Sequence, residues 1–153
     1  MVMLDELIKE KCPNGVKYAK VGQIAEVGTG KSNGNEAMEN GEFPFYVRSQ
    51  TVKRKNDYEY DEEALIIPGE GGIGDIYHYV NGKYALHQRV YRIHFIKDGI
   101  DTRYMYYYFS SNFKKFITRK AMNATVTSIR KPMIESFTVP VLPIEIQSEI
   151  VRI

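Results

Sequence analysis

The amino-acid sequence predicts an α+β fold, in which a twisted and mainly antiparallel β-sheet packs against an amphipathic helix. Short extended segments bounded by Gly, Pro, Asn and Asp fill most of the first two-thirds of the chain. Helical spacing of apolar residues is clearest over residues 102–122 and at the C-terminal end. With 153 residues, 43% of them hydrophobic and 26% charged, the chain fits one ordinary globular domain.

The first half is expected to contain one short helix, then strands and loops. We expect an amphipathic helix at residues 4–10, a turn at 13–15 and an extended segment at 16–27. A loop at 28–35 and a strand at 43–47 should follow. Pro44 lacks an N–H, so it places its strand at a sheet edge or itself begins the strand. The acidic run at 57–63 is expected to be a solvated loop.

Residues 64–67 are predicted to form a buried strand that ends at Pro68-Gly69. Asn81-Gly82 is the strongest two-residue hairpin signal in the sequence, so the extended segments 76–80 and 84–95 are predicted to pair around it. Within the second segment, alternation would point His87 and Arg89 to one face and Gln88 to the other.

The helix predicted over residues 102–122 has an apolar face and an opposite basic face. The apolar face comprises Met105, Tyr108, Phe109, Phe113, Phe116 and Ile117, and the basic face Lys114, Lys115 and Arg119. Residues 137–143 are expected to be extended. Ile146, Ile150 and Ile153 then have the spacing of one helix face, and Pro143 suits the first turn of that helix.

Several classes of site are disfavoured. Gly30-Lys31-Ser32 resembles the end of a phosphate-binding loop, but Ala25 stands where that loop needs its first glycine. Residues 69–74 fit a dinucleotide-type glycine pattern without the helix that should follow, so a strand-to-strand turn is the better interpretation. One cysteine and three histidines make a zinc site improbable. The single cysteine and the lack of a membrane-length apolar run indicate a cytoplasmic protein.

The charge distribution favours a polyanionic partner, although the net charge is only +2. Residues 110–134 and 43–56 contain no acid and several Lys and Arg residues. Such segregation focuses positive potential of the kind that attracts nucleic acid. The alternative, that each basic run is only a solvated face, stays open for any one run.

Taken together, these segments resemble a target recognition domain from the specificity subunit of a Type I restriction–modification enzyme. The resemblance covers nearly the whole chain and rests on the order and spacing of segments 12–18, 21–31, 41–47, 69–74, 124–129 and 139–150. The last segment, Val139-Pro140-Val141-Leu142-Pro143-Ile144-Glu145-Ile146-Gln147-Ser148-Glu149-Ile150, is similar to the family pattern I-P-(L/V)-P-P-L-x-E-Q-x-x-I. Departures from the family are Leu142 for a proline, Ile146 for Glu and Phe45 for Trp.

The resemblance implies a non-catalytic subunit that binds one half of a split DNA target. Methylation subunits using S-adenosylmethionine and restriction subunits using ATP would be its partners, so no cofactor is expected in this chain. Residues 1–142 would be the recognition domain, with 1–15 as its N-terminal helix and turn. Residues 143–153 would begin a coiled-coil spacer, whose partner interface includes Ile146, Ile150 and Ile153. That spacer would join a second recognition domain in cis or by homodimerisation, which makes the chain a half-subunit or a truncated piece.

The candidate DNA-binding residues fall into two groups. Those expected at phosphates are Lys53, Arg54, Lys55, Lys114, Lys115, Arg119 and Lys120. Those expected at base edges or the adjacent backbone are Arg48, Gln50, Gln88, Arg89, Thr125, Thr127, Ser128 and Arg130, with Lys131 beside them and Lys31 able to serve either role. The hydroxyls of residues 125–128 have the alternative role of capping the following turn. A rival interpretation of the chain is a β-rich peptide- or carbohydrate-binding module with a docking helix, which its twelve tyrosines would suit.

Overall fold

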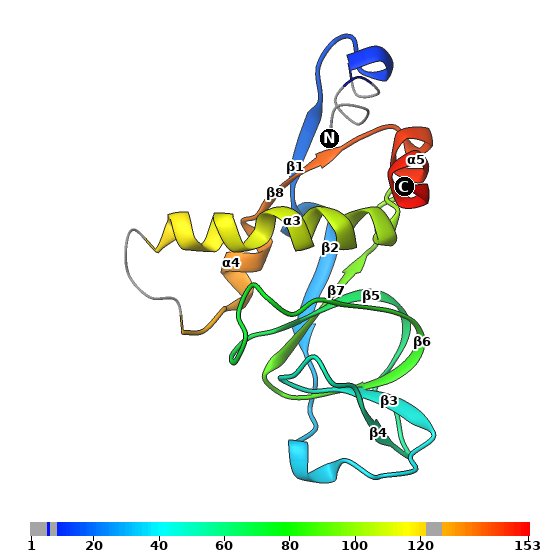
Figure 1. Ribbon diagram of the computed structural model, residues 1–153, viewed down its shortest axis with the longest axis vertical. Helices are drawn as coiled ribbons and strands as arrows, with labels where there is room; N and C mark the ends of the chain where they lie inside the picture. The colour runs from blue at the N-terminus through cyan, green and yellow to red at the C-terminus, as the bar shows by residue number, and fades with distance from the viewer. Residues whose placement is uncertain (1–5, 7–8, 122–126) are drawn as a thin grey trace.

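The computed structural model describes Glu6 and residues 9–121 and 127–153 (Figure 1). Its strands are β1 Lys17–Lys20, β2 Ala25–Thr29, β3 Phe43–Tyr46, β4 Lys53–Lys55, β5 Tyr60–Pro68, β6 His78–Leu86, β7 Val90–Phe95 and β8 Thr138–Val141. Its helices are α2 Val21–Ile24, the 3-10 turn η1 Gly34–Glu36, α3 Thr102–Lys120, α4 Lys131–Glu135 and α5 Ile144–Arg152. The predicted α+β class is confirmed.

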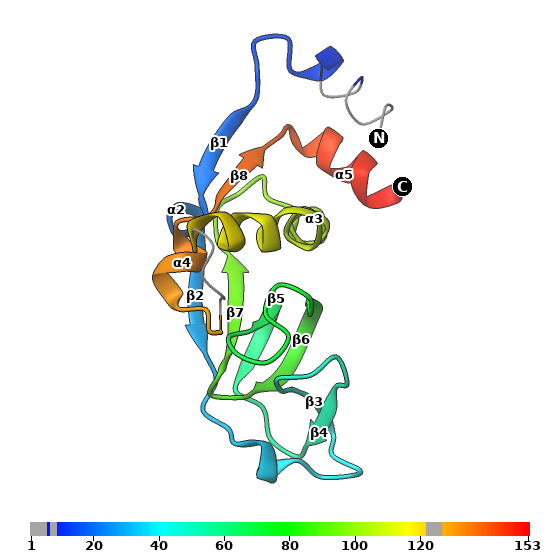
Figure 2. The ribbon, with the colours of Figure 1, turned by 60° about the vertical axis from the view of Figure 1, so that its left-hand side comes forward.

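Six strands form one sheet in the order β2-β7-β5-β6-β3-β4, and β1 pairs with β8 in a separate two-stranded ribbon. All pairings are antiparallel except that of β3 with β6. Figure 2 shows α3 crossing between the β1–β8 ribbon above and the larger sheet below, with α4 beside β2. The helix therefore joins the two sheets into one structure.

The long helix α3 forms where its apolar spacing predicts it. The Asp101 side chain accepts from the Arg103 N–H at 2.9 Å and so caps the first turn. Its buried face packs against the sheet through Tyr104, Met105, Phe109, Phe113 and Ile117. Full burial of one such side chain contributes about 1.5–3 kcal/mol, so this face provides much of the core.

Strand β5 confirms the buried strand expected at 64–67. Its side chains alternate between two clusters, as the strand period requires. Leu65 and Ile67 belong to the core beneath α3, whereas Ala64 and Ile66 belong to a second cluster on the opposite face. Both faces of this strand are covered, which explains its continuous apolar sequence.

The hairpin predicted at Asn81-Gly82 is wrong. Both residues lie inside β6, where they pair with Glu63 and Glu62 of β5. Gly82 has φ +135°, a conformation that favours glycine, so it accommodates a local distortion of the strand rather than a turn. The long partner strand β5 continues past this point and keeps β6 extended, and β5 also separates β6 from β7.

The acidic run at 57–63 is only partly the solvated loop that was predicted, because Asp61, Glu62 and Glu63 lie in β5. The Glu62 and Arg92 side chains are each 11% exposed and form an ion pair at 2.6 Å. The Tyr84 hydroxyl donates to the same carboxylate at 2.6 Å. A charge this enclosed needs such partners, and Arg92 supplies the opposite charge from β7.

Three further expectations need adjustment at their boundaries. The extended segment 16–27 is interrupted by α2, because Val21 and Ile24 turn into the core and the Lys20 N–H donates to Gln23 Oε1 at 3.0 Å. Pro44 is the second residue of β3, an interior strand, and pairs with Arg54 of β4, whereas the pairing of β3 with β6 begins at Phe45, so Pro44 lies near the start of the strand and not in an edge strand. Of the helix predicted at 4–10, the described residues 6, 9 and 10 are helical, and the others lie outside the described residues.

The C-terminal segment is confirmed as strand β8 followed by helix α5. The apolar stripe is not open along its whole length, because Ile146 is 1% exposed and packs into the domain core. Ile150 is partly buried against that core, and Ile153 is 67% exposed. Gln147 fixes the helix in place, since its Nε2 donates to the carbonyls of Gly99 and Leu142 at 2.8 and 2.7 Å.

Candidate nucleic-acid interface

A glycine-rich loop, residues 69–77, connects β5 to β6 and borders two hollows in the surface. Gly71, Gly72 and Gly74 have φ between +65° and +78°, which other residues rarely adopt. The loop begins between two backbone hydrogen bonds of 2.8 Å, from the Gly69 N–H to the Arg89 carbonyl and from the Ile129 N–H to the Gly69 carbonyl. Three separate segments of the chain therefore meet at Gly69.

The first hollow, of about 260 Å³, brings together four of the residues predicted to contact bases. Gln88 and Arg89 come from the turn between β6 and β7, and Ser128 and Arg130 come from the segment before α4. We call this hollow the readout hollow; it is lined by Thr29, Gly69, Glu70, Gln88, Arg89, Tyr91, Ser128, Ile129 and Arg130. Gathering amide, hydroxyl and guanidinium donors in one concave site suits the recognition of base edges or phosphates.

The turn that carries Gln88 and Arg89 is not the strand that alternation predicted. The His87 N–H donates to the Tyr46 carbonyl at 3.0 Å, and the His87 carbonyl accepts from the Val90 N–H at 3.1 Å. The Arg89 N–H donates to His87 Nδ1 at 2.9 Å, which closes the turn. Burial, followed by the charges of Arg48 and Arg89, lowers the pKa of His87, which favours the neutral imidazole that this acceptor role requires.

The second hollow, of about 860 Å³, lies between the glycine-rich loop and the C-terminal half of α3. It brings together Gln50, Lys114, Lys115 and Arg119, all of them predicted DNA-binding residues. We call it the basic hollow; Gly74, Asp75, Tyr77, Tyr106, Ser110, Ser111 and Thr118 complete its lining. Lys114 reaches across to Asp75 at 2.7 Å, with both side chains more than half exposed, so this pair contributes little to stability.

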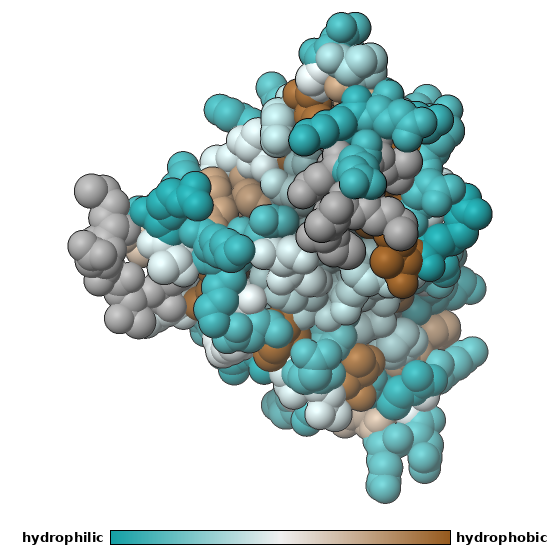
Figure 3. All heavy atoms as spheres, turned by 45° about the horizontal axis from the view of Figure 1, so that its top comes forward, coloured by the Kyte–Doolittle hydropathy of each residue, from teal (hydrophilic) through white to brown (hydrophobic). Residues whose placement is uncertain are grey.

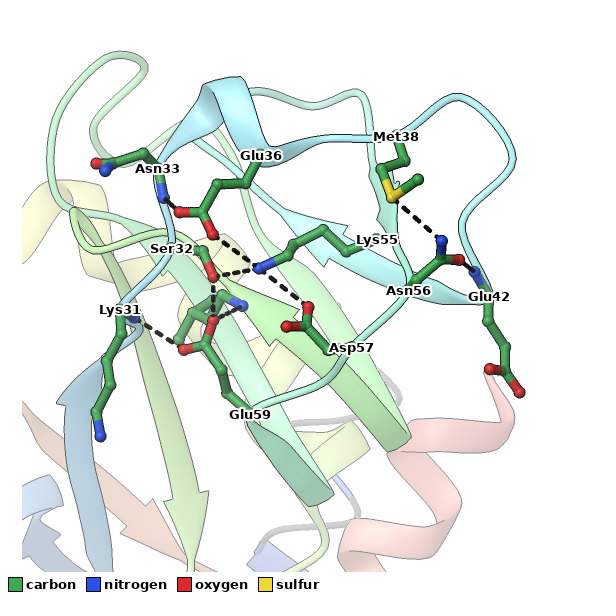
Figure 4. A network of polar contacts seen from close by, with 11 residues as sticks. Lys31, Ser32, Asn33, Glu36, Met38, Glu42, Lys55, Asn56, Asp57 and Glu59 are labelled. Atoms are coloured by element: carbon green, nitrogen blue, oxygen red, sulfur yellow. Dashed lines mark hydrogen bonds and ion pairs between the residues drawn. The ribbon is translucent and has the colours of Figure 1, made fainter.

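A polar network on the other side of the β6–β7 turn holds the loop that carries Lys31 (Figure 4). The Glu59 carboxylate accepts from the Lys31 N–H at 2.8 Å, from the Ser32 hydroxyl and from the Leu86 N–H at 3.3 Å. Lys55 donates to the Ser32 hydroxyl at 2.8 Å. The Lys31 backbone is thereby fixed while its side chain stays exposed.

Lys55 itself was predicted to contact phosphate, but the structure gives it a different role. Its side chain is 8% exposed and pairs with Glu36 at 3.2 Å and Asp57 at 3.1 Å. Burial alone would lower the pKa of Lys55, but the hydrogen bonds that its ammonium donates to Asp57 and Glu36 outweigh it and raise the pKa. Its ammonium is committed to the network, so we leave Lys55 out of the proposed interface.

The other predicted residues surround the two hollows or lie apart from them. Arg48 reaches the readout hollow by pairing with Glu70 at 3.0 Å. Arg54 donates to the carbonyls of Gly41 and Glu42, so it holds its own loop at the β4 end of the sheet. The predicted residues that are exposed and line neither hollow are Lys31, Lys53, Lys120, Thr127 and Lys131. Thr125 lies outside the described residues.

Sequence reasoning missed Glu70 and Glu59. Glu70 contacts both Arg48 and Arg89, the latter at 3.6 Å, inside the readout hollow. Glu59 belongs to the acidic run that was predicted to be solvated. Local sequence patterns carry no signal for either role, because the partners are distant in sequence. Lys31 precedes Glu59 by 28 residues, and Arg48 precedes Glu70 by 22.

The surface beside β1 and β8 offers little support for a peptide- or carbohydrate-binding site. A hollow of about 350 Å³ beside β1 and β8 contains Tyr18 and Tyr107, which are 62% and 48% exposed. Figure 3, with the β1–α5 end turned forward, shows small separate hydrophobic patches on a mainly hydrophilic surface. Tyr104 and Phe109 of α3 are buried in the core.

Among residues 9–121 and 127–153, no three His, Cys, Asp or Glu side chains converge as metal ligands would. No helix in the same part of the chain is long and apolar enough to cross a membrane.

Comparison with known proteins identifies close similarities. The family model described as "Type I restriction modification DNA specificity domain" matches residues 13–153. The chain is 32% identical over 129 residues to the Type I restriction enzyme EcoDI specificity subunit of Escherichia coli. The aligned region is 84% of this chain and 28% of that subunit.

Solved structures share the fold at lower sequence identity. The S subunit of a Type I restriction–modification system from M. genitalium superposes on this chain with a TM-score of 0.80 and 15% identity. The match covers 99% of this chain and 41% of the S subunit. The HsdS subunit from Thermoanaerobacter tengcongensis superposes with a TM-score of 0.64 and 13% identity, and the match covers 99% of this chain and 41% of that subunit. The chain therefore spans well under half of these relatives.

Proposed function

Because the chain belongs to the family of Type I restriction modification DNA specificity domains, we propose that it recognises one half of a split target in double-stranded DNA. In this proposal the chain directs methylation and restriction subunits to that target and performs no catalysis itself. S-adenosylmethionine and ATP are then used by the partner subunits. Such a complex would act on DNA in the cytoplasm.

The observation that carries the proposal is the position of the two hollows on either side of one glycine-rich loop. Lys114, Lys115 and Arg119 in the basic hollow are exposed cations on one helix face, which suits phosphate contacts that set the register. Gln88, Arg89 and Arg130 in the readout hollow offer the amide and guanidinium groups that pair with adenine and guanine edges. Positioning and readout are thus assigned to neighbouring surfaces.

The C-terminal helix α5 would begin the spacer to a second recognition domain, in cis or by homodimerisation. Ile146 anchors α5 in this domain, so the spacer's own interface would begin at Ile150 and Ile153, where burial decreases. The relatives leave room for this arrangement, because the chain covers 41% of the S subunit from M. genitalium. The boundary between residues 1–142 and 143–153 is part of the same proposal.

Binding of fluorescent duplex DNA by the full chain at two salt concentrations tests the proposal. Affinity should fall steeply with salt, with a logarithmic slope of about −0.9 for each phosphate contacted. The triple variant Lys114→Ala/Lys115→Ala/Arg119→Ala should reduce that slope by about 3 if each residue contacts one phosphate.

The matched control removes three exposed lysines elsewhere, in Lys17→Ala/Lys20→Ala/Lys97→Ala. Both variants lose the same net charge, so only a local interface separates them. Equal effects of the two variants would show that binding depends on overall charge and would contradict the assignment of the basic hollow. Absence of binding to any duplex would contradict the proposed function.

A further inference from the structure

We propose that Glu70 is a specificity-determining residue, whose carboxylate accepts a hydrogen bond from an exocyclic base amino group in the major groove, the N4 amino of cytosine. This inference rests on the proposed function and deepens it. It assigns a role in base readout to the one acid among the described residues that line the readout hollow.

Glu70 lines the readout hollow between two arginines. Arg48 Nη1 donates to Oε2 at 3.0 Å, and Arg89 Nη1 lies 3.6 Å from Oε1. The Glu70 side chain is 37% exposed, so it faces the hollow and remains accessible. Each carboxylate oxygen has two lone pairs, which leaves acceptor capacity for a ligand after both arginines are satisfied.

The backbone beside Glu70 is held rigidly, as discrimination between bases requires. Gly69 is fixed by its hydrogen bonds to Arg89 and Ile129, each of 2.8 Å. A Cβ at Gly69 would lie 3.0 Å from the Arg89 carbonyl oxygen and 2.9 Å from the Tyr91 ring, so the chain passes these groups as closely as glycine allows. Gly71 on the other side has φ +65°. The hydrogen bonds of Gly69 fix the backbone from which the Glu70 side chain extends, and the two arginines orient its carboxylate.

The charge of the hollow explains how a carboxylate can approach DNA. An isolated acid would be repelled by the phosphates, but Arg48 and Arg89 flank Glu70 and offset its charge. A carboxylate accepts hydrogen bonds only, so it can pair with the amino groups of cytosine or adenine and cannot pair with the acceptor oxygens of guanine or thymine. Acidic side chains characteristically accept from cytosine N4, which is why we choose that base.

The experiment selects bound sequences from a randomised duplex pool, using the full-length wild-type chain, Glu70→Ala and Glu70→Gln. The wild type should enrich a motif with cytosine at one position. Glu70→Ala should lose the preference at that position alone, by roughly fivefold or more, because a mismatched base pair typically weakens binding by that factor at least. Glu70→Gln should shift the preference there toward adenine, since Gln pairs with the adenine edge.

Asp75→Ala is the matched control, because Asp75 pairs with Lys114 in the basic hollow as Glu70 pairs with arginines in the other. It should raise affinity for all sequences together and leave the motif unchanged. An unchanged motif in Glu70→Ala, with affinity altered equally for all sequences, would overturn the inference and reduce Glu70 to a positioning role. Wild-type preference for adenine at the lost position would overturn the choice of cytosine N4. Failure of the wild type to enrich any motif would instead contradict the proposed function.

Discussion

The ion pair of Glu62 and Arg92 should be essential to the sheet that supports the readout hollow. Arg92 Nε and Nη2 donate to Glu62 at 2.7 and 2.6 Å, and the guanidinium stacks 4.6 Å from the centre of the Tyr60 ring. Glu62→Ala removes the main partner of a guanidinium whose side chain is 11% exposed. What remains is Glu26, 4.0 Å away with a side chain 52% exposed, which is a weak substitute.

Loss of one member of a buried ion pair costs about 3–5 kcal/mol of unfolding free energy. The remaining contact with Glu26 and the slight exposure of Arg92 should bring the cost of Glu62→Ala to the lower end, about 3 kcal/mol. Against a typical total of about 5–15 kcal/mol, such a loss is readily measured. Urea unfolding followed by circular dichroism at neutral pH provides the assay.

The double variant Glu62→Leu/Arg92→Leu should be less destabilised than Glu62→Ala, because it leaves no unpaired charge in the sheet. Glu42→Ala, at an exposed position, is the control and should change stability by no more than about 0.5 kcal/mol. A loss below about 1 kcal/mol in Glu62→Ala, or a double variant with a lower unfolding free energy than Glu62→Ala, would show that the ion pair does not support the sheet.

The same pair predicts a dependence of stability on pH. Burial alone would raise the pKa of Glu62, but hydrogen bonds from Arg92 and Tyr84 outweigh it and lower the pKa. A carboxylate with a depressed folded pKa stabilises the fold above its unfolded pKa and loses that contribution as pH falls through the folded pKa. Wild-type unfolding free energy should therefore decrease below about pH 4, and the Glu62→Ala variant should show a smaller decrease.

Three other substitutions test the interface and the C-terminal helix. Arg130→Ala should cost about 1–3 kcal/mol on the selected target and little on unrelated duplex DNA, and equal losses in a binding assay would assign Arg130 to phosphate. Ile146→Ala should lower the unfolding free energy by about 2–5 kcal/mol, whereas Ile153→Ala should change it by less than about 0.5 kcal/mol. Reversed effects in denaturation would contradict the anchoring role of Ile146. Gln147→Leu should lower the unfolding free energy by about 1–3 kcal/mol, because the carbonyls of Gly99 and Leu142 lose their hydrogen-bond donor. An unfolding free energy equal to that of the wild type would show that Gln147 does not hold α5 in place.

Periodic patterns predicted the elements whose packing depends on one face. Helix α3 was predicted because its apolar residues repeat at helical spacing and that face alone reaches the core. The Asn81-Gly82 signal failed because a local turn preference competes with the pairing of β6 along most of β5, and the pairing prevails. Short α2 was not predicted, since only two of its four residues are buried and its position depends on a distant contact with Phe137.

The candidate site was predicted in composition but not in arrangement. Acid-free windows identified Arg130 and the α3 cations, the ability to pair with base edges identified Gln88 and Arg89, and the fold gathers these residues at two hollows. Lys55 looked equivalent to Lys53 in sequence, and only the approach of Glu36 and Asp57 distinguishes it. Glu70 becomes significant only where Arg48 and Arg89 converge on it, which no local pattern reveals.

Hydrogen–deuterium exchange of the full chain, with and without its selected duplex, tests most directly the claim that DNA binds at the two hollows. DNA should slow exchange in the glycine-rich loop 69–77, in the turn 87–89 and in residues 127–131. Exchange in β1, β8 and α5 should stay unchanged, because those elements lie on the other side of α3 from the glycine-rich loop (Figure 1). Protection confined to β1, β8 and α5, with none around the hollows, would contradict the account.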